Sequence, residues 1–358
     1  MVLEFLVKIS NPPNNVLGTI VFLAYIAAAL VLTSHIVLSL YKQHQRHPPR
    51  SRHGTTVLVA FSIVSFATLS YHMSRYLLSS YLNWSLTQSF FRPHDSRSVW
   101  AWMLNSHLFT SFAKELLRDE PSRKVTQIAL LETWGWNVWM ARNGTPIPSP
   151  PPPKSIQYKT PPFPIAASLY ILTSPPSPQK ASYHSLQTRT LLPYIALGQI
   201  LPITFTTSLF ALRLSFLPTP SPKSSPPPTN SSIRSSILHI PLLLLTLLFQ
   251  SLSFFLPRFR RSNFFTGLVL VTRVFLLLPY APRLLSTTRR RPSTAGAGGY
   301  VTVAAVVALK LAGAVREVGG SEIGRVMTGE GGWSVKALGW DAVVGVGVAV
   351  WLCVRGGV

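Results

Sequence analysis

The chain has 358 residues, of which 47% are hydrophobic and only 12% are charged. Charged residues make up about a quarter of soluble domains, so this composition excludes an ordinary soluble domain and indicates a polytopic membrane protein. The formal net charge is +23, but the basic residues cluster between apolar runs. That pattern favours loops beside membrane helices and gives no reason to expect a nucleic-acid partner.

The first expected membrane helix covers residues 16–40, an uncharged apolar run. It is longer than the ~20 residues that a helix needs to cross a bilayer. A loop with several basic residues and no acid follows it, which indicates a cytoplasmic side. The amino terminus would then face the lumen.

A second span is expected at residues 55–81, and its second half is dotted with polar residues. Tyr71 or His72 and then Arg75 follow at helical spacing, so one stripe of this helix is polar. Lipid offers no hydrogen-bond partners, so such a stripe must face other helices or a cavity. For Arg75 the alternative is that its side chain reaches the nearer membrane interface.

The next region holds most of the chain's few acids and many aromatic residues. Five of the ten acidic residues are Asp95, Glu115, Asp119, Glu120 and Glu132. Residues 106–117 have amphipathic helical spacing, and Pro121 is expected to end that helix. Residues 125–140 then form a third, marginally apolar span, in which Glu132 stands one turn from Trp136.

A Pro-rich basic loop, residues 145–189, divides the chain into two membrane regions, residues 1–144 and 190–358. Its prolines exclude helix and favour an extended polyproline II conformation. We expect a linker, with a ligand for proline-binding domains as the alternative.

The second membrane region supplies the remaining expected spans. These are residues 190–217, 237–256, 264–279, 300–315 and 337–354. Pro193, Gly198 and Pro202 interrupt the first of them near Gln199, and prolines there free carbonyls that can line a cavity. The sequence thus predicts an all-α bundle of about seven or eight transmembrane helices. Sequons at Asn83 and Asn230 make these asparagines candidate glycosylation sites.

Motifs for soluble-enzyme chemistry and for metal or nucleotide binding are missing, so no cofactor and no metal is expected. Protonation chemistry remains open, because a carboxylic acid kept neutral by an apolar site can donate a proton to an alkene or epoxide. Glu132 stands among Trp134, Trp136 and Tyr71, whose aromatic faces suit a developing cation. The equally weighted alternative is an ion pair of Glu132 with Arg75 or Arg273 that holds the bundle together.

Several stretches resemble fungal polytopic membrane proteins of secondary-metabolite gene clusters. They are SFATLSYHMSRYLLSSYLNW (65–84), LFTSFAKELL (108–117), TQIALLETWGWNVWMARNG (126–144) and PYIALGQILPITFTTSLFAL (193–212). This family includes membrane proteins of indole-diterpene clusters, and some similar proteins are transmembrane terpene cyclases. The resemblance implies a small apolar residue where Glu132 stands and an acid nearer Asn143, so the chain departs from it there.

The leading hypothesis is an integral, multi-pass enzyme of the endoplasmic reticulum that cyclises a lipophilic terpenoid between spans two, three and four. The candidate catalytic acids are Glu132, Asp95, Asp119 and Glu115. The candidate substrate-binding residues are Tyr71, His72, Arg75, Trp134, Trp136 and Gln199. The expected partners are the lipophilic substrate, membrane lipid and other enzymes of the pathway. The alternatives are a metabolite exporter and a membrane scaffold for pathway enzymes.

Overall fold

A computed structural model describes residues 15–46, 52–91, 98–143, 188–217, 239–260, 262, 265–280, 312–313 and 316–355. Within these ranges the chain is helical and contains no strand. The prediction of an all-α protein is therefore confirmed for the described part of the chain. The Pro-rich loop, Asp95, Asn230 and nearly all of the expected span at residues 300–315 lie outside it.

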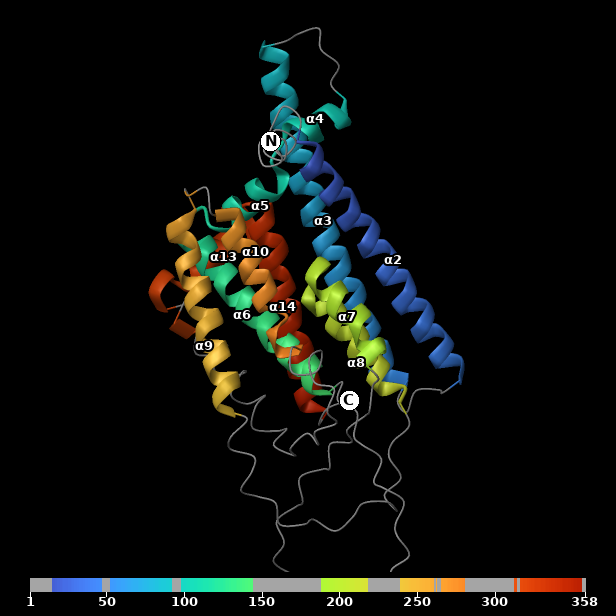
Figure 1. The fold of residues 1–358 in the computed structure, drawn as a ribbon. Helices are drawn as coiled ribbons and strands as arrows, with labels where there is room; N and C mark the ends of the chain where they lie inside the picture. Colours follow the sequence, from blue (N-terminus) through green and yellow to red (C-terminus); the bar gives the residue numbers. More distant parts are fainter. Residues whose placement is uncertain are drawn as a thin grey trace, which may run out of the picture.

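The helices run mostly up and down in one bundle (Figure 1). In chain order they are α2 (Val16–Arg46), α3 (Arg52–Phe91), α4 (Val99–Asn105), α5 (Leu108–Leu116), α6 (Glu120–Asn143), α7 (Thr188–Ile200), α8 (Ile203–Ser215), α9 (His239–Phe255), α10 (Phe265–Phe275), α13 (Gly320–Arg325) and α14 (Trp333–Val354). A π-helical turn, Val326–Glu330, leads from α13 to α14.

Three of these helices are long and apolar enough to cross a membrane, judged by length and composition. They are α2, α3 and α14, and they coincide with the spans expected at residues 16–40, 55–81 and 337–354. There are also two shorter apolar stretches. Residues 190–200 belong to α7, and residues 267–280 begin in α10 and continue past its end.

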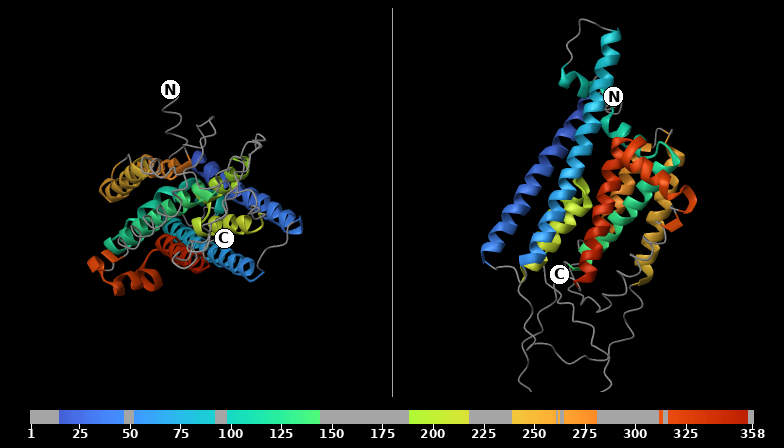
Figure 2. Two further views of the ribbon diagram at one scale, coloured as in Figure 1. Left: turned by 90° about the horizontal axis from the view of Figure 1, so that it is seen from below. Right: turned by 180° about the vertical axis from the view of Figure 1, so that it is seen from behind.

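Four helices make up the centre of the bundle. Helix α14 packs against α3, α6 and α8, and α3 also packs against α8. Helix α2 lies outside α7, and α9 lies on the other side of α6, as Figure 2 shows from two further directions. Eleven of the thirteen residues of α8 are buried, so α8 is an interior helix.

The largest hydrophobic cluster joins helices from both expected membrane regions. It includes Ile36 of α2, Leu58 of α3, Met140 of α6, Tyr194 of α7, Phe210 of α8 and Val348 of α14. Close packing of this kind fixes neighbouring helices relative to one another. Residues before and after the Pro-rich loop therefore share one core.

The expected interruption at Pro202 is confirmed, because α7 ends at Ile200 and α8 begins at Ile203. The interruptions expected at Pro193 and Gly198 were wrong, because both residues lie inside the continuous helix α7. The carbonyls of the last turn of α7, which were expected to line a cavity, accept hydrogen bonds from side chains. The Tyr25 hydroxyl donates to the carbonyls of Gln199 and Ile200 at 3.1 and 2.6 Å. Arg273 Nη1 also donates to the Gln199 carbonyl, at 2.8 Å. Side chains from α2 and α10 thus satisfy acceptors that the break leaves without helical donors.

The expectation for Pro121 was wrong. Helix α5 ends at Leu116, and Pro121 lies in the first turn of α6. Proline is tolerated there because the first N–H groups of a helix have no intrahelical acceptor. Asp119 precedes this turn and its side chain accepts a hydrogen bond from the Ser122 N–H at 2.8 Å. Asp119 therefore caps α6.

Candidate functional site

Two carboxyl groups are buried where α3, α6, α8 and α14 meet. Glu132 of α6 and Asp341 of α14 are each only 6% exposed. The two carboxyls are close enough to interact electrostatically. We call Glu132 and Asp341, together with Ser65, Trp136 and Thr204 that contact them, the carboxyl site.

Glu132 is held by its own helix and by a glycine opposite. Trp136 Nε1 donates to Glu132 Oε1 at 3.2 Å, which confirms that these side chains share a face of α6. The carboxyl lies directly against Gly345, because a Cβ atom built there would collide with Glu132 Oε1 and lie 2.7 Å from Thr204 Oγ1. The missing side chain at Gly345 makes the space for this acid.

Asp341 is held by hydroxyls from two other helices. Ser65 Oγ donates to Asp341 Oδ1 at 2.9 Å. Thr204 Oγ1 donates to the backbone carbonyl of Asp341, also at 2.9 Å. Ser65 is 1% exposed and Thr204 is fully buried. Since Gly345 lies one turn after Asp341 on α14, Thr204 stands between the two acids.

Within the described ranges, neither carboxyl forms an ion pair with a lysine or arginine. Arg75 lies with its Cζ atom 4.9 Å from the centre of the Trp333 ring. Arg273 donates to the Gln199 carbonyl. The alternative role of Glu132, an ion pair with one of these arginines, is therefore not formed. A buried acid without a cationic partner is costly in an apolar interior and marks a functional site more often than a structural one.

Asp119 and Glu115, the other candidate acids within the described ranges, do not join the carboxyl site. Asp119 is exposed and caps α6. Glu115 of α5 packs against Gly332 at the start of α14, more than two turns before Asp341. Its Oε2 atom is buried without a hydrogen-bond partner in the described structure. No group of three or more metal-ligating side chains is placed to hold a metal ion among the described residues.

The aromatic residues expected around Glu132 separate into three places, and Tyr71 lies in a groove between α3 and α14. Trp136 belongs to the carboxyl site. Trp134 is fully buried and stacks on Phe249 of α9, with ring centres 5.1 Å apart. Gln199 serves the helix break through its carbonyl. Asn83 is exposed in the last third of α3, and its carbonyl accepts a hydrogen bond from Thr87.

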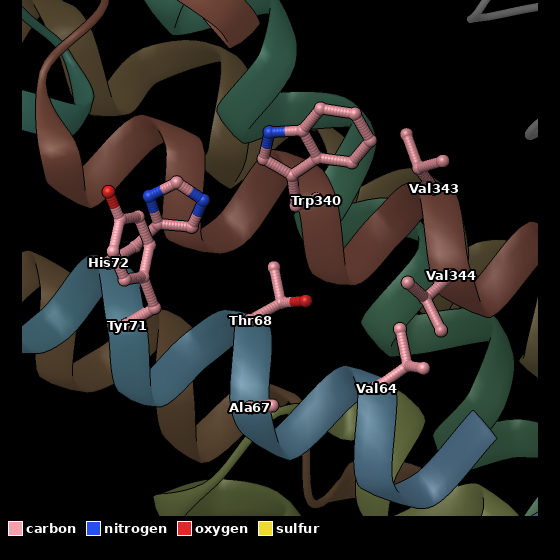
Figure 3. A pocket seen from close by; sticks show the side chains of 8 residues that line it. All are labelled: Val64, Ala67, Thr68, Tyr71, His72, Trp340, Val343 and Val344. Atoms are coloured by element: carbon pink, nitrogen blue, oxygen red, sulfur yellow. The ribbon is translucent and has the colours of Figure 1, made fainter. Parts of the chain in front are cut away.

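Tyr71 and His72 line a groove of about 490 Å³ between α3 and α14. Its walls are formed by Val64, Ala67, Thr68, Tyr71, His72, Trp340, Val343 and Val344. Figure 3 shows the α3 side chains facing those of α14 across it. Ser65 and Asp341 directly follow the groove residues Val64 and Trp340 in the sequence, so the carboxyl site lies behind the groove wall.

The sequence interpretation missed Asp341 and Thr204. Asp341 stands in an apolar run just as Glu132 does, so the same signal could have found it. Thr204 gave no such signal, because a threonine in a helix commonly bonds a carbonyl of the preceding turn. Its role becomes apparent only when α8 and α14 are seen in contact.

No family model matches this chain, and no curated protein or solved structure matches it.

Proposed function

We propose that this chain is a multi-pass membrane enzyme that cyclises a lipophilic terpenoid by acid-triggered cation chemistry. It has seven or eight spans, resides in the endoplasmic reticulum and belongs to fungal secondary metabolism, as its resemblance implies. The observation that carries the proposal is the pair of buried acids, Glu132 and Asp341, without a cationic partner in the described structure.

The proposed reaction needs a proton donor at its start and a proton acceptor at its end. One carboxyl of the pair protonates an alkene carbon or an epoxide oxygen, and the electrons of further double bonds close the ring. The carbocation then loses a proton to the other carboxyl, and transfer of that proton back to the first carboxyl resets the pair, so the reaction is an isomerisation that consumes nothing. The Trp136 indole is held at Glu132 Oε1, where its aromatic face can stabilise a developing cation.

Buried polar atoms on α6 and α8, the helices that carry Glu132 and Thr204, support a site for a ligand with a hydroxyl or carbonyl group. Ser208 lies one turn after Thr204 on α8 and is fully buried. Its hydroxyl has no hydrogen-bond partner in the described structure. Asn137 lies five residues after Glu132, and its Nδ2 atom also has no hydrogen-bond partner in the described structure. The Oδ1 atom of the same side chain accepts a hydrogen bond from the Tyr280 hydroxyl at 2.8 Å. Buried polar atoms normally have partners, so these atoms are ones that a bound molecule could satisfy.

The test is expression in yeast with a panel of polyprenyl and epoxy-polyprenyl substrates, followed by product analysis. Cyclised product is expected from the unchanged chain and is expected to be lost in Glu132→Gln and in Asp341→Asn. Glu322→Gln is the matched control, because Glu322 is a surface acid paired with Arg325 at 3.1 Å. It should leave the product yield unchanged.

Two outcomes would overturn the proposal: no cyclised product from any substrate, or unchanged yield in both acid variants. Fluorescence-detected size-exclusion chromatography of each variant separates lost chemistry from lost folding. Deleting the gene in its producing strain distinguishes the other functions. An uncyclised precursor supports the enzyme, whereas retention of the finished product inside the cell points to an exporter and an even drop in flux to a scaffold.

A further inference from the structure

Two cations share one indole ring at the start of α14. Arg75 Cζ lies 4.9 Å and Lys336 Nζ lies 4.5 Å from the centre of the Trp333 ring. Lys336 Nζ also donates to the Gly329 carbonyl at 2.7 Å, which leaves further donors on this ammonium group. Glu115 packs close by against Gly332, yet it forms no ion pair with either cation within the described ranges. Among the described residues, two cationic side chains thus stand beside one acidic side chain, so the ring marks a place with an excess of basic groups.

His72 connects this cationic place to the groove between α3 and α14. Its ring lies 5.9 Å from that of Trp333, and the residue also lines the groove. His72 is only 8% exposed, and its Nδ1 atom is buried without a hydrogen-bond partner in the described structure. Arg75 follows His72 by one turn of α3. The unpaired Nδ1 atom of His72 and the two cationic side chains thus lie at the same end of the groove.

The rest of the groove is suited to a hydrocarbon chain. Val64, Ala67, Val343 and Val344 line its other end, and the eight described lining residues include no acid. Val64 and Tyr71 are two turns apart, so the groove extends roughly 10 Å along α3. Figure 3 shows Ala67 as a small side chain at its base, with Val343 and Val344 opposite.

The position of the groove along α14 matches that of a lipid. The helix has 22 residues, which gives it a length of roughly 33 Å, about the thickness of the hydrocarbon core of a bilayer. Trp333 and Lys336 stand at the start of this helix and Val344 near its middle. The cations would therefore lie at the level of the headgroups and the apolar end of the groove at the level of the acyl chains.

We propose that this groove is a binding site for an anionic phospholipid, with the phosphate on Arg75, Lys336 and His72 and one acyl chain between α3 and α14. A lipid is the occupant that both halves fit, because charge complementarity selects the phosphate and the apolar walls select the chain. The site uses none of the five residues of the carboxyl site, so it holds independently of the proposed cyclase.

The test uses the full chain purified in a neutral detergent, with lipid binding followed by native mass spectrometry. The probes are the anionic dioleoyl phosphatidylglycerol, the zwitterionic dioleoyl phosphatidylcholine, and glycerol phosphate, which is a headgroup without acyl chains. Phosphatidylglycerol should bind about tenfold more tightly than phosphatidylcholine. Arg75→Gln should reduce that preference about fivefold, the effect expected for one basic residue at a membrane surface.

Matched variants separate this site from general effects of charge and size. Arg258 also lies over an aromatic ring, 5.3 Å from that of Phe255, so Arg258→Gln should keep the preference. Ala67→Phe fills the groove from an exposed position and should weaken both phospholipids. Ala27→Phe, at an exposed position of α2, should weaken neither. Lys336→Gln is a second variant of the proposed phosphate site. Arg75 is exposed, so Arg75→Gln remains informative if Lys336→Gln fails to fold.

Three results would overturn the proposal. The first is equal binding of the two phospholipids by the unchanged chain. The second is the same loss in Arg258→Gln as in Arg75→Gln, which would mean that overall charge sets the preference. The third is binding of glycerol phosphate as tight as that of phosphatidylglycerol, which would show a site for soluble anions.

Discussion

Helix α8 buries polar side chains, whereas helix α2 exposes large apolar ones. Each of these features is the reverse of what a soluble protein would show. Helix α8 lies inside the bundle, and its consecutive polar residues Thr206, Thr207 and Ser208 are fully buried. Helix α2 lies at the edge and exposes large apolar side chains, with Leu30 62% and Val31 67% exposed. Polar groups face inward and apolar groups outward, which is the arrangement that a hydrocarbon surrounding favours.

The hydroxyls of α8 show how polar side chains are accommodated there. Thr206 donates to the Pro202 carbonyl at 3.3 Å and Thr207 to the Ile203 carbonyl at 2.7 Å, both within their own helical turn. Thr204 instead donates to α14, at Asp341. Hydroxyls that return to their own helix add no specificity. The one that crosses to another helix is part of the carboxyl site.

The largest expected effect tests whether the contrast between interior and edge holds energetically. Phe210→Ala removes a fully buried ring of α8 and should lower the free energy of unfolding by about 3–5 kcal/mol. Leu30→Ala on α2 should change it by less than about 0.5 kcal/mol. Thermal and denaturant unfolding in detergent measure both. Similar losses in the two variants would show that α2 is packed against something as closely as α8 is.

A smaller effect is expected where α14 makes room for Glu132. Gly345→Ala places a methyl group against the Glu132 carboxyl and the Thr204 hydroxyl, and overpacking of this kind costs about 1–3 kcal/mol. Gly267→Ala on α10 meets nothing within 4 Å and should be neutral or slightly stabilising.

The same unfolding assay gives a check on the cause of the Gly345 effect. Adding Glu132→Ala to Gly345→Ala should cost less than the sum of the two single variants, because the clash disappears with the carboxyl. Strict additivity would mean that the glycine acts through the backbone and that the carboxyl does not occupy its space.

The hydrogen bond from Ser65 to Asp341 should contribute less again. Ser65→Ala removes the hydroxyl that donates to the buried Asp341 carboxyl and should cost about 1.5–2 kcal/mol. Ser251→Ala is the control, since this exposed serine bonds only the Leu247 carbonyl of its own helix. Equal effects of the two substitutions would place Ser65 among the ordinary helix hydroxyls.

The smallest effect concerns an acid at the edge of the bundle. Asp119→Ala removes the cap of α6 and should cost about 1 kcal/mol of stability. Under the proposed function it should leave product formation unchanged once the protein is folded. Complete loss of product with a stable fold would move the proton donor from the interior to this edge.

Periodicity and apolar length predicted the helices well where the local sequence alone determines the helix. The runs at residues 16–40 and 55–81 and the Trp136 contact of Glu132 follow from local spacing, and the described helices contain all three. The break at Pro202 was predicted from the missing N–H of one residue. The same reasoning failed at Pro193, which lies inside α7.

What could not be predicted depends on which helices meet. Ser65, Glu132 and Asp341 are far apart in the sequence, and only the packing of α3, α6 and α14 joins them. Charge complementarity suggested Arg75 and Arg273 as partners for Glu132. It carries no information, however, on where these side chains lie in the fold. Their actual partners are an indole ring and a backbone carbonyl, neither of which a count of charges includes.

The two carbonyls at the end of α7 bring together segments that the ribosome makes at different times. Their donors, Tyr25 and Arg273, come from helices made before and after α7 during synthesis. A nascent chain that has not yet produced α10 leaves the Gln199 carbonyl with only the Tyr25 hydroxyl. A chain truncated before Arg273 would therefore lack one of the two side-chain donors that the described structure gives the Gln199 carbonyl.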